Sequence, residues 1–378
     1  MNKKLVAAAV ASALAVPMAA HAVKFETSGQ VNRAVMVADD GVQSDVLHVD
    51  GESSGSRFRF TGSEDIGNGL TAGVNFEIEL QSNDASVVDV DQQGDVQTFR
   101  ERHVNVYFSG DFGKLTMGQA SDATDGAAFA DLNNAWFTVE NFPDFGGGVD
   151  FRDKNDLTSG FQTTGITVAD VNPSFDGGRR DTLRYDTPAI GPLSAAVSHS
   201  TDSRVDAMVK LAGSVAGGAY DLRGGWNNTG DGLWVVSGSF KFAQGTSITG
   251  AWGQQSFDDV VLAGTTFRTP DAEYFYIKLG HDWGNNSVAA HYKSSEDTAA
   301  IAGTPGFTQC SGGSVAGAVV TLDTCGGTAW AVGFSHTMPK PKVDLYAGYQ
   351  FFELDDTAPG LSVEDISVFV VGSRIKFD

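Results

Sequence analysis

The sequence has few basic residues, cysteines and prolines, and past its N-terminus it contains no long apolar run. Its 378 residues carry 25 lysines and arginines against 47 acids, a formal net charge of −22, and only 41% are hydrophobic. This excess of acids would repel phosphate backbones, so we expect no nucleic-acid partner. Two cysteines and ten prolines exclude a disulfide scaffold and a collagen repeat. The 46 glycines indicate a chain rich in strands and turns.

The first 22 residues have the pattern of a cleaved export signal. Two lysines precede a short alanine-rich run, and Ala20-His21-Ala22 forms a small-residue cleavage site. The alternative, a short transmembrane anchor, is disfavoured because the run is short and ends in small residues. The mature chain would begin at Val23 and carry 23 basic against 47 acidic residues, a net charge of −24. Without a long apolar run, it is either soluble or crosses a membrane as a β-barrel.

Apolar and polar residues alternate along the mature chain with the period of β-strands. From Leu70 to Leu80 every second residue is apolar, and the same alternation recurs at 270–283 and 341–353. Between turn signals we predict sixteen strands, at 25–37, 55–62, 69–81, 98–110, 113–119, 180–188, 191–201, 204–214, 217–228, 231–242, 245–257, 270–283, 286–295, 327–338, 341–353 and 363–377.

The connections between these strands alternate between tight turns and long loops. The long loops are predicted at 38–54, 82–97, 120–179, 258–269, 296–326 and 354–362. Tight turns on one rim, long loops on the other and an even strand count are typical of an all-β, sixteen-stranded antiparallel transmembrane barrel over residues 23–378. A soluble sandwich or propeller would also alternate, but it would need neither aromatic girdles nor a 60-residue insertion between neighbouring strands.

Four stretches resemble the general porins of Gram-negative bacteria. Residues 56–80 (SRFRFTGSEDIGNGLTAGVNFEIEL) resemble the family's second and third strands with their turn, and 106–119 and 179–200 resemble later strand pairs. NFPDFGGG at 141–148 is similar to the tip of the family's third loop. The resemblance implies a sixteen-stranded barrel with an inward-folded third loop, usually homotrimeric, that admits small hydrophilic solutes across the outer membrane. The family usually ends on Phe; here Phe377, followed by Asp378, is the expected assembly signal.

Residues 120–179 form the only segment long enough to fold into so wide a pore and narrow it. Between positions 120 and 160 this predicted constriction loop carries eight acids against Arg152 and Lys154. We assign the acidic side of the constriction to Asp122, Asp125, Asp131, Glu140 and Asp144.

The opposite side of the constriction is predicted to be basic. Alternation places Arg57 and Arg59 in the lumen because Phe58 and Phe60 hold the outer face, and Arg57 matches an arginine of the family's constriction. By the alternation of its strand, Arg102 falls on the same face as outward residues, so it needs a bulge or a position at the rim to reach water. The predicted basic wall is Arg57, Arg59, Arg102, Arg180 and Arg184.

These charges predict a passive pore for small hydrophilic solutes and ions. Acids facing arginines create a transverse field that orients dipolar solutes, and the acidic balance predicts a preference for cations. No catalytic motif or metal-binding histidine spacing is found, so we predict neither an enzyme nor a cofactor. Two alternatives stay open. One is a substrate-selective porin, for which an inward aromatic series is the only hint toward sugars: Tyr274, Tyr276, Tyr346 and Phe352. The other is a structural or adhesive barrel.

Two loop features predict local stabilisation. Cys310 and Cys325 lie in one long loop of an exported protein, where we expect a disulfide. Asp84, Asp89, Asp91 and Asp95 offer oxygen ligands for weak calcium or magnesium binding, although a solvated acidic loop is the simpler interpretation. Divalent ions held by such loops would bridge the protein to lipopolysaccharide.

Overall fold

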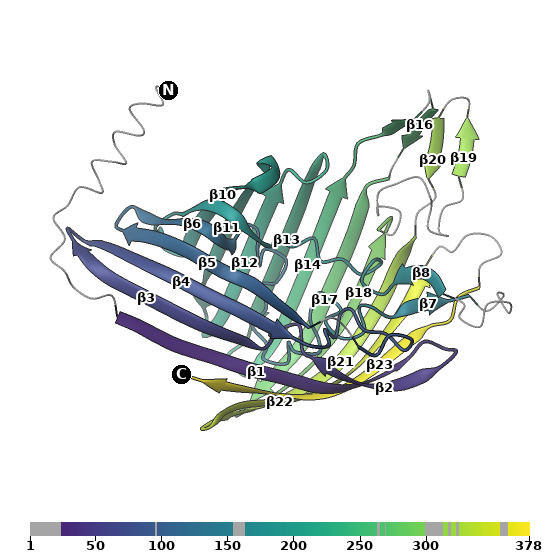
Figure 1. Ribbon diagram of the computed structural model, residues 1–378, viewed down its shortest axis with the longest axis horizontal. Coiled ribbons are helices and arrows are strands. Elements are labelled where there is room, and N and C mark those ends of the chain that lie inside the picture. The colour runs from purple at the N-terminus through teal and green to yellow at the C-terminus, as the bar shows by residue number, and fades with distance from the viewer. Residues whose placement is uncertain are drawn as a thin grey trace.

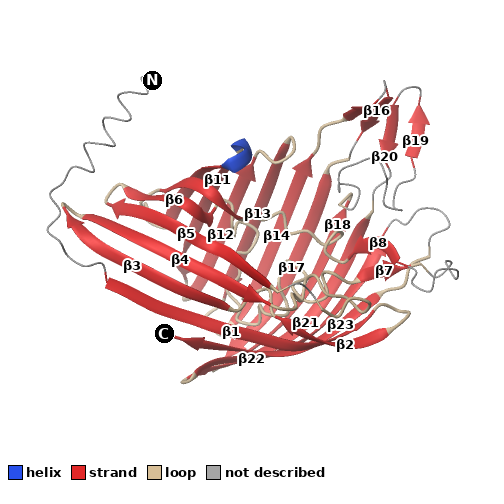
Figure 2. Cartoon of the chain, viewed as in Figure 1, coloured by secondary structure: helices blue, strands red, loops and turns tan. Residues whose placement is uncertain are grey.

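The computed structural model describes residues 24–94, 97–153, 163–262, 265–268, 270–298, 313–316, 319–322, 325–355 and 362–378. The predicted export signal lies outside these residues. Strands dominate the described part of the chain, in which the only helical element is a short 3-10 turn at Thr201–Ser203 (Figure 2). Nowhere in these ranges is a helix both long and apolar enough to cross a membrane.

Sixteen antiparallel strand positions form a closed barrel (Figure 1). Consecutive strands pair around the wall, and β23 pairs back onto β1 from Gly29 opposite Phe377 to Asp39 opposite Ser367. The predicted sixteen-stranded barrel is therefore confirmed. Its strands are β1 (Lys24–Asp39), β3 (Arg57–Gly67), β4 (Leu70–Gln81), β5 (Thr98–Gly110), β6 (Gly113–Ser121), β9 (Arg179–Asp186), β10 (Leu193–Ser200), β11 (Val205–Val215), β12 (Gly218–Asn227), β13 (Gly232–Lys241), β14 (Thr246–Ser256), β17 (Ala272–Trp283), β18 (Asn286–Glu296), β21 (Gly326–Pro339), β22 (Lys342–Asp355) and β23, the last spanning Ile366–Phe377.

One position of the wall is shared by two strands. The first half of β1 pairs with β3, and its second half pairs with β2 (Ser44–Asp50). The long connection predicted at 38–54 therefore contains the end of β1 and the additional strand β2, which the sequence analysis did not predict. β1 extends beyond the reach of β3, and β2 supplies the hydrogen-bonding partners that its exposed backbone would otherwise lack.

Further short strands occur within the long loops. The segment between β6 and β9 contains a hairpin of β7 (Asp150–Arg152) and β8 (Thr163–Thr167). Four more strands form a separate sheet outside the wall: β15 (Val260–Leu262), β16 (Thr265–Arg268), β19 (Gly313–Ala316) and β20 (Val319–Leu322). These segments were predicted as loops because their strands are too short to show a clear alternation.

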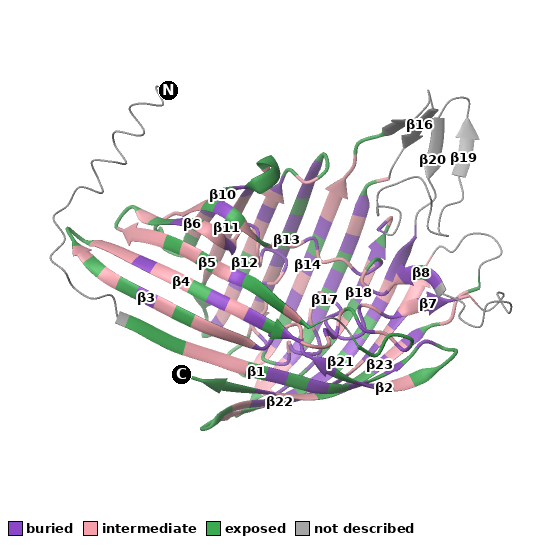
Figure 3. Cartoon of the chain, in the orientation of Figure 1, coloured by how far each residue is buried: buried purple, intermediate pink, exposed green. Residues whose placement is uncertain are grey.

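The outer surface of the barrel is an apolar band. Exposed and buried residues alternate along the wall strands (Figure 3). On β17, Phe275, Ile277 and Leu279 are 44 to 58% exposed, whereas Tyr276 and Lys278 between them are 1 to 2% exposed. A closed sheet with such a surface satisfies its backbone internally and suits a lipid environment.

The apolar core lies inside the barrel, between the inner wall and residues 122–153 and 163–175. Phe137, Phe145 and Val149 of this segment pack against Tyr346 and Val368 of β22 and β23 in one cluster. A second cluster joins Ala127, Ala128 and Phe175 to β13, β14 and β17. Wall side chains alone cannot fill a barrel of this width, so the segment between β6 and β9 completes the core.

A pair of glycines on the inner wall lets this segment approach the strands closely. Gly333 on β21 lies directly opposite Gly348 on β22. A Cβ atom added at either position would overlap Thr138. Two paired glycines therefore create the space in which residues 137–139 pack.

Candidate functional site

Three of the predicted wall arginines gather around two glutamates of β4. Arg57 and Arg59 on β3 both contact Glu77, with Arg57 Nη1 3.5 Å from Glu77 Oε1. Arg102 on β5 donates from Nε to Glu77 Oε1 at 2.8 Å and from Nη1 to Glu79 at 2.9 Å. The two glutamates are almost completely buried. This group, the arginine cluster, therefore contains three positive charges and two negative ones on one side of the lumen.

A β-bulge brings Arg102 into this cluster. Glu77 pairs with His103, the next residue Ile78 pairs with Glu101, and Arg102 between them has no partner on β4. The extra residue reverses the alternation of β5 at this point, so that Arg102 turns inward although its parity is that of outward residues. The bulge that the sequence analysis required for this arginine is present.

Arg180 and Arg184 on β9 contact the beginning of the loop. The Nε atom of Arg180 lies 3.6 Å from Asp122 Oδ2. Arg184 forms a close pair with Asp186 at 2.7 Å and donates from Nη1 to the Asp122 carbonyl at 2.8 Å. These arginines therefore hold the chain where it leaves β6, a role that no local sequence pattern indicated.

The first three acids of the loop are paired with wall cations. Asp122 is buried, accepts the Gly178 backbone N–H at 3.1 Å and also lies 3.6 Å from Arg204. Asp125 lies 3.9 Å from Arg179. Asp131 receives the buried Lys278 ammonium at 2.7 Å. Much of the formal negative charge of the loop is thus neutralised where the loop docks.

The last two predicted acids differ because their charge is suppressed. Burial raises the pKa of Glu140 to about 7. Burial and the neighbouring Glu140 raise the pKa of Asp144 well above its ordinary value. Glu52 joins this acidic group, and burial together with Asp84 and Glu79 raises its pKa to about 8. With pKa values of about 7 and about 8, Glu140 and Glu52 are partly protonated at neutral pH, so they contribute less negative charge than the sequence suggests.

Two buried lysines fasten the loop to the wall. Lys278 Nζ donates to the Val139 carbonyl at 2.9 Å in addition to its ion pair. Lys293 on β18 donates to the carbonyls of Asn141, Asn172 and Pro173 at 2.8, 2.9 and 2.6 Å. The sequence analysis did not identify Lys293, although its position beside the outward Tyr292 indicates that it faces the lumen.

The inward aromatic residues do not form an open track. Tyr274, Tyr276, Tyr346 and Phe352 are each only 2% exposed. Phe137 stacks on Tyr346 with ring centroids 4.8 Å apart, and Phe175 meets Tyr274 edge to face at 5.4 Å. The loop therefore covers the aromatic side chains that had hinted at sugar binding.

The remaining predicted residues lie away from the loop contacts. Phe377 faces outward on β23 with its ring 6.4 Å from that of Phe58. Cys325 is buried, whereas Cys310 lies outside the described residues, so the disulfide stays a prediction. Asp95 also lies outside them. The other aspartates of that loop have protein partners, with Asp84 bound to Arg100 and Asp91 to Arg152. In the described ranges no group of three or more His, Cys, Asp or Glu side chains could hold a metal ion.

Comparisons with known proteins agree with this architecture. A family model described as Gram-negative porin matches residues 7–357. Among solved structures, an anion-selective porin from Comamonas acidovorans is 14% identical with a TM-score of 0.58, covering 94% of this chain and 100% of that one. A loop-deletion mutant of OmpT from Vibrio cholerae is 13% identical with a TM-score of 0.56, over the same shares of the two chains. At this identity, the likeness to these structures shows the fold. No curated protein sequence matches the chain.

Proposed function

The chain belongs to the family of Gram-negative porins, and we propose that it forms a passive pore for small hydrophilic solutes and ions. Membership of this family implies the outer membrane. The observation that carries the proposal is the packing of residues 122–153 and 163–175 against the inner wall of a closed barrel with an apolar outer band. A segment that fills only part of the lumen leaves a narrowed passage beside it. Such a passage limits the size of the solutes that can diffuse through the barrel.

The passage is lined by both basic and acidic side chains. The arginine cluster lies on β3 and β5, and the acidic group of Glu52, Glu140 and Asp144 belongs to the loops. Opposite charges within a narrow throat orient dipolar solutes and disfavour apolar ones. This arrangement supports diffusion rather than catalysis, and we propose no enzymatic activity.

We further propose that the pore prefers cations. The mature chain would carry a net charge of −24, and acids on its long loops raise the local concentration of cations at the outer mouth. Pairing of Asp122, Asp125 and Asp131 with wall cations keeps this preference moderate. The same acidic loops would bind divalent ions and, through them, lipopolysaccharide.

Export and assembly complete the proposal. Residues 1–22 would be removed as a signal peptide during export. Phe377 would serve as the signal for insertion into the outer membrane. The pore would assemble as a homotrimer, as the family resemblance implies and as an OmpT structure from Vibrio cholerae in its trimer form illustrates.

Planar-bilayer recording of the purified mature protein tests the proposal. We expect stepwise openings in groups of three and, in a potassium chloride gradient, a reversal potential of the sign that marks cation preference. An anion-selective reversal potential would refute the preference alone. Block by a low concentration of one solute would instead indicate a substrate-selective porin. A correctly folded barrel without conductance would contradict the pore and favour a structural role.

A further inference from the structure

A cavity, the loop cavity, lies between the loop that follows β6 and the wall strands β14 and β17. Its volume is about 680 Å³, and its lining includes Phe129, Asp131, Trp136, Glu140 and Asn141 of the loop and Tyr276 of β17. Of the described residues that line it, three are aromatic, two are acidic and none is basic. The loop cavity therefore combines apolar rings with carboxyl and amide oxygens.

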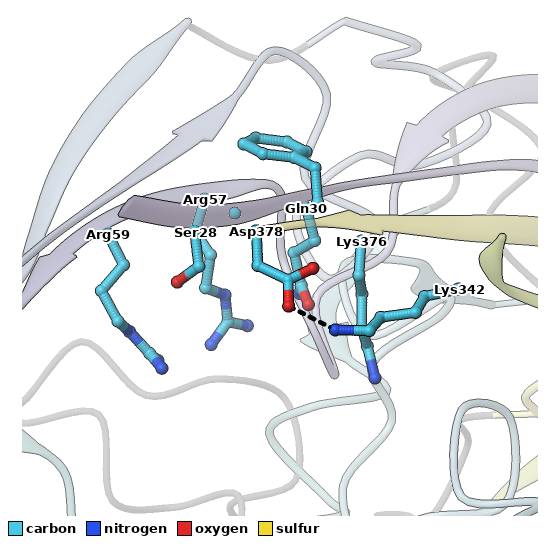
Figure 4. A pocket seen from close by; sticks show the side chains of 9 residues that line it. Ser28, Gln30, Arg57, Arg59, Lys342, Lys376 and Asp378 are labelled. Carbon is cyan, nitrogen blue, oxygen red and sulfur yellow. Dashed lines mark hydrogen bonds and ion pairs between the residues drawn. The ribbon is translucent and has the colours of Figure 1, made fainter. Parts of the chain in front are cut away.

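Several basic side chains of the lumen gather around a different cavity. Figure 4 shows Arg57, Arg59 and Lys376 extending to the same side of the sheet, with Lys342 beside Asp378. They line a hollow at the short-turn end of β22 and β23, and none of them lines the loop cavity. A ligand in the loop cavity is therefore recognised by another set of side chains, whose charge is of the opposite sign.

Trp136 provides an aromatic surface in the loop cavity. Phe137 stacks on it with ring centroids 4.2 Å apart, and Tyr346 continues the stack 4.8 Å from Phe137. Trp136 is only partly buried and makes no further ring contact in the described part of the chain. The Arg374 guanidinium lies 5.2 Å from the centre of the Trp136 ring, but it is paired with Asp344 at 2.7 Å. The exposed part of Trp136 can therefore receive a flat apolar group or a cation, because an aromatic ring attracts both.

The two carboxyl groups of the loop cavity differ in how far their charge is compensated. Asp131 receives the Lys278 ammonium at 2.7 Å and the Asn133 backbone N–H at 2.9 Å. Glu140 has no ion-pair partner among the described residues, and burial raises its pKa to about 7. The Oδ1 atom of Asn141 also has no hydrogen-bond partner in these ranges. At pH 8.5 the loop cavity thus contains one carboxylate without an ion pair and one unpaired amide oxygen, which together favour a cation.

We propose that the loop cavity binds an organic ammonium ion with a flat apolar body, such that Glu140 binds the ammonium group and Trp136 packs against the body. The carboxylate accepts charge-assisted hydrogen bonds from the ammonium, and Trp136 with Phe129 adds dispersion and cation–π attraction. An aromatic alcohol lacks the charge, and a short alkylamine lacks the ring, so neither makes both sets of contacts. The site rests on the proposed pore function, which brings the ligand into the lumen, and it deepens that function by naming a class of solute that the loop retains.

Titration of the purified protein with phenethylamine at pH 8.5 tests the proposal. Isothermal titration calorimetry in detergent measures the affinity, and planar-bilayer recording measures the loss of potassium current as the amine is added. We expect saturable binding. Phenethyl alcohol, which has the same ring without the charge, should bind about tenfold more weakly. Butylamine, which has the charge without the ring, should bind about fivefold more weakly.

Substitutions in the loop cavity test the assigned roles. Glu140→Gln keeps the shape of the side chain and removes its charge, so the affinity for phenethylamine should fall about tenfold. Trp136→Leu should weaken binding about fivefold, whereas Trp136→Phe retains a ring and should stay within about twofold of the unmodified protein. Trp252→Leu is the matched control, because Trp252 lies on the outer face of β14, is 37% exposed and does not line the loop cavity. Its affinity should be unchanged.

Three results would overturn the proposal: no saturable binding of phenethylamine, equal affinity for butylamine, or unchanged affinity in Glu140→Gln. The ligand series and Glu140→Gln keep the test decisive even if Trp136→Leu disturbs the stack on Phe137. A protein that conducts but does not bind would reject the ammonium site and leave the pore intact. A protein that binds but does not conduct would support the ammonium site and contradict the pore.

Discussion

Lys293→Met should release the loop from the barrel wall. The Lys293 side chain is 2% exposed, and its ammonium donates to the carbonyls of Asn141, Asn172 and Pro173, which lie on two distant parts of the loop. The same ammonium lies 5.0 Å from the centre of the Tyr274 ring. One side chain thus fastens both residue 141 and residues 172–173 of the loop to β18.

The expected cost follows from these contacts. Methionine fills most of the lysine volume but donates no hydrogen bond, and each buried carbonyl left without a partner costs about 1–3 kcal/mol. Removal of a buried charge recovers part of its desolvation cost, which offsets part of the loss. A net loss of about 3 kcal/mol in loop docking shifts the ratio of docked to undocked loop by about 150-fold.

Single-channel recording detects this shift. We expect Lys293→Met to show higher mean conductance and more current noise than the unmodified protein, while the barrel itself stays folded. Lys210→Met is the matched control, because Lys210 lies on β11, pairs with Asp221 at 3.1 Å and is 35% exposed. The reasoning would be refuted by a Lys293→Met channel whose conductance and noise equal those of the control.

Three further predictions concern charge and packing. The pKa values of Glu140 and Glu52, about 7 and about 8, lie above the ordinary 4.5, so stability should fall as the pH rises from about 4.5 and level off above about 8, and the reversal potential should shift toward cations as these carboxyls ionise; a pH-independent reversal potential would contradict this. Gly348→Val should overlap Thr138, cost about 1–3 kcal/mol and raise conductance, and unchanged conductance would disprove the close approach. Glu77→Gln should leave Arg57 and Arg59 without their carboxylate while Arg102 keeps Glu79, shift the reversal potential toward anions and lower the thermal midpoint, and no change in either would argue against the cluster.

Alternation along the sequence was sufficient to predict the wall of the barrel. A strand with lipid on one side and a polar lumen on the other must alternate, and residues such as Phe275 and Lys278 show that pattern directly. The sequence pattern failed for β2, whose existence depends on the length of β1 and on where β3 stops pairing. That information lies in the register of the sheet.

The loop charges were harder to predict because their partners are distant in sequence. Asp131 meets Lys278, and Asp122 meets Arg204. Proximity of this kind depends on how the described residues of the loop pack against the inner wall, which no local sequence pattern encodes. The position of Arg102 was partly predictable. The alternation of β5 places this charged residue on the outer face, which already indicated a bulge, and the structure shows where on β5 the bulge occurs.

The distribution of ion pairs changes the interpretation of the net charge. A count of acids along the loop assigns the throat a strong negative field, but Asp122, Asp125 and Asp131 lie against wall cations, and burial raises the pKa of Glu140 and Asp144. On the other side, a few carboxylates are divided among more numerous basic side chains. The electric field that acts on a solute in the pore therefore depends on how the carboxylates are distributed among the basic side chains. For this reason a single substitution such as Glu77→Gln can alter selectivity more than the removal of a fully exposed loop acid.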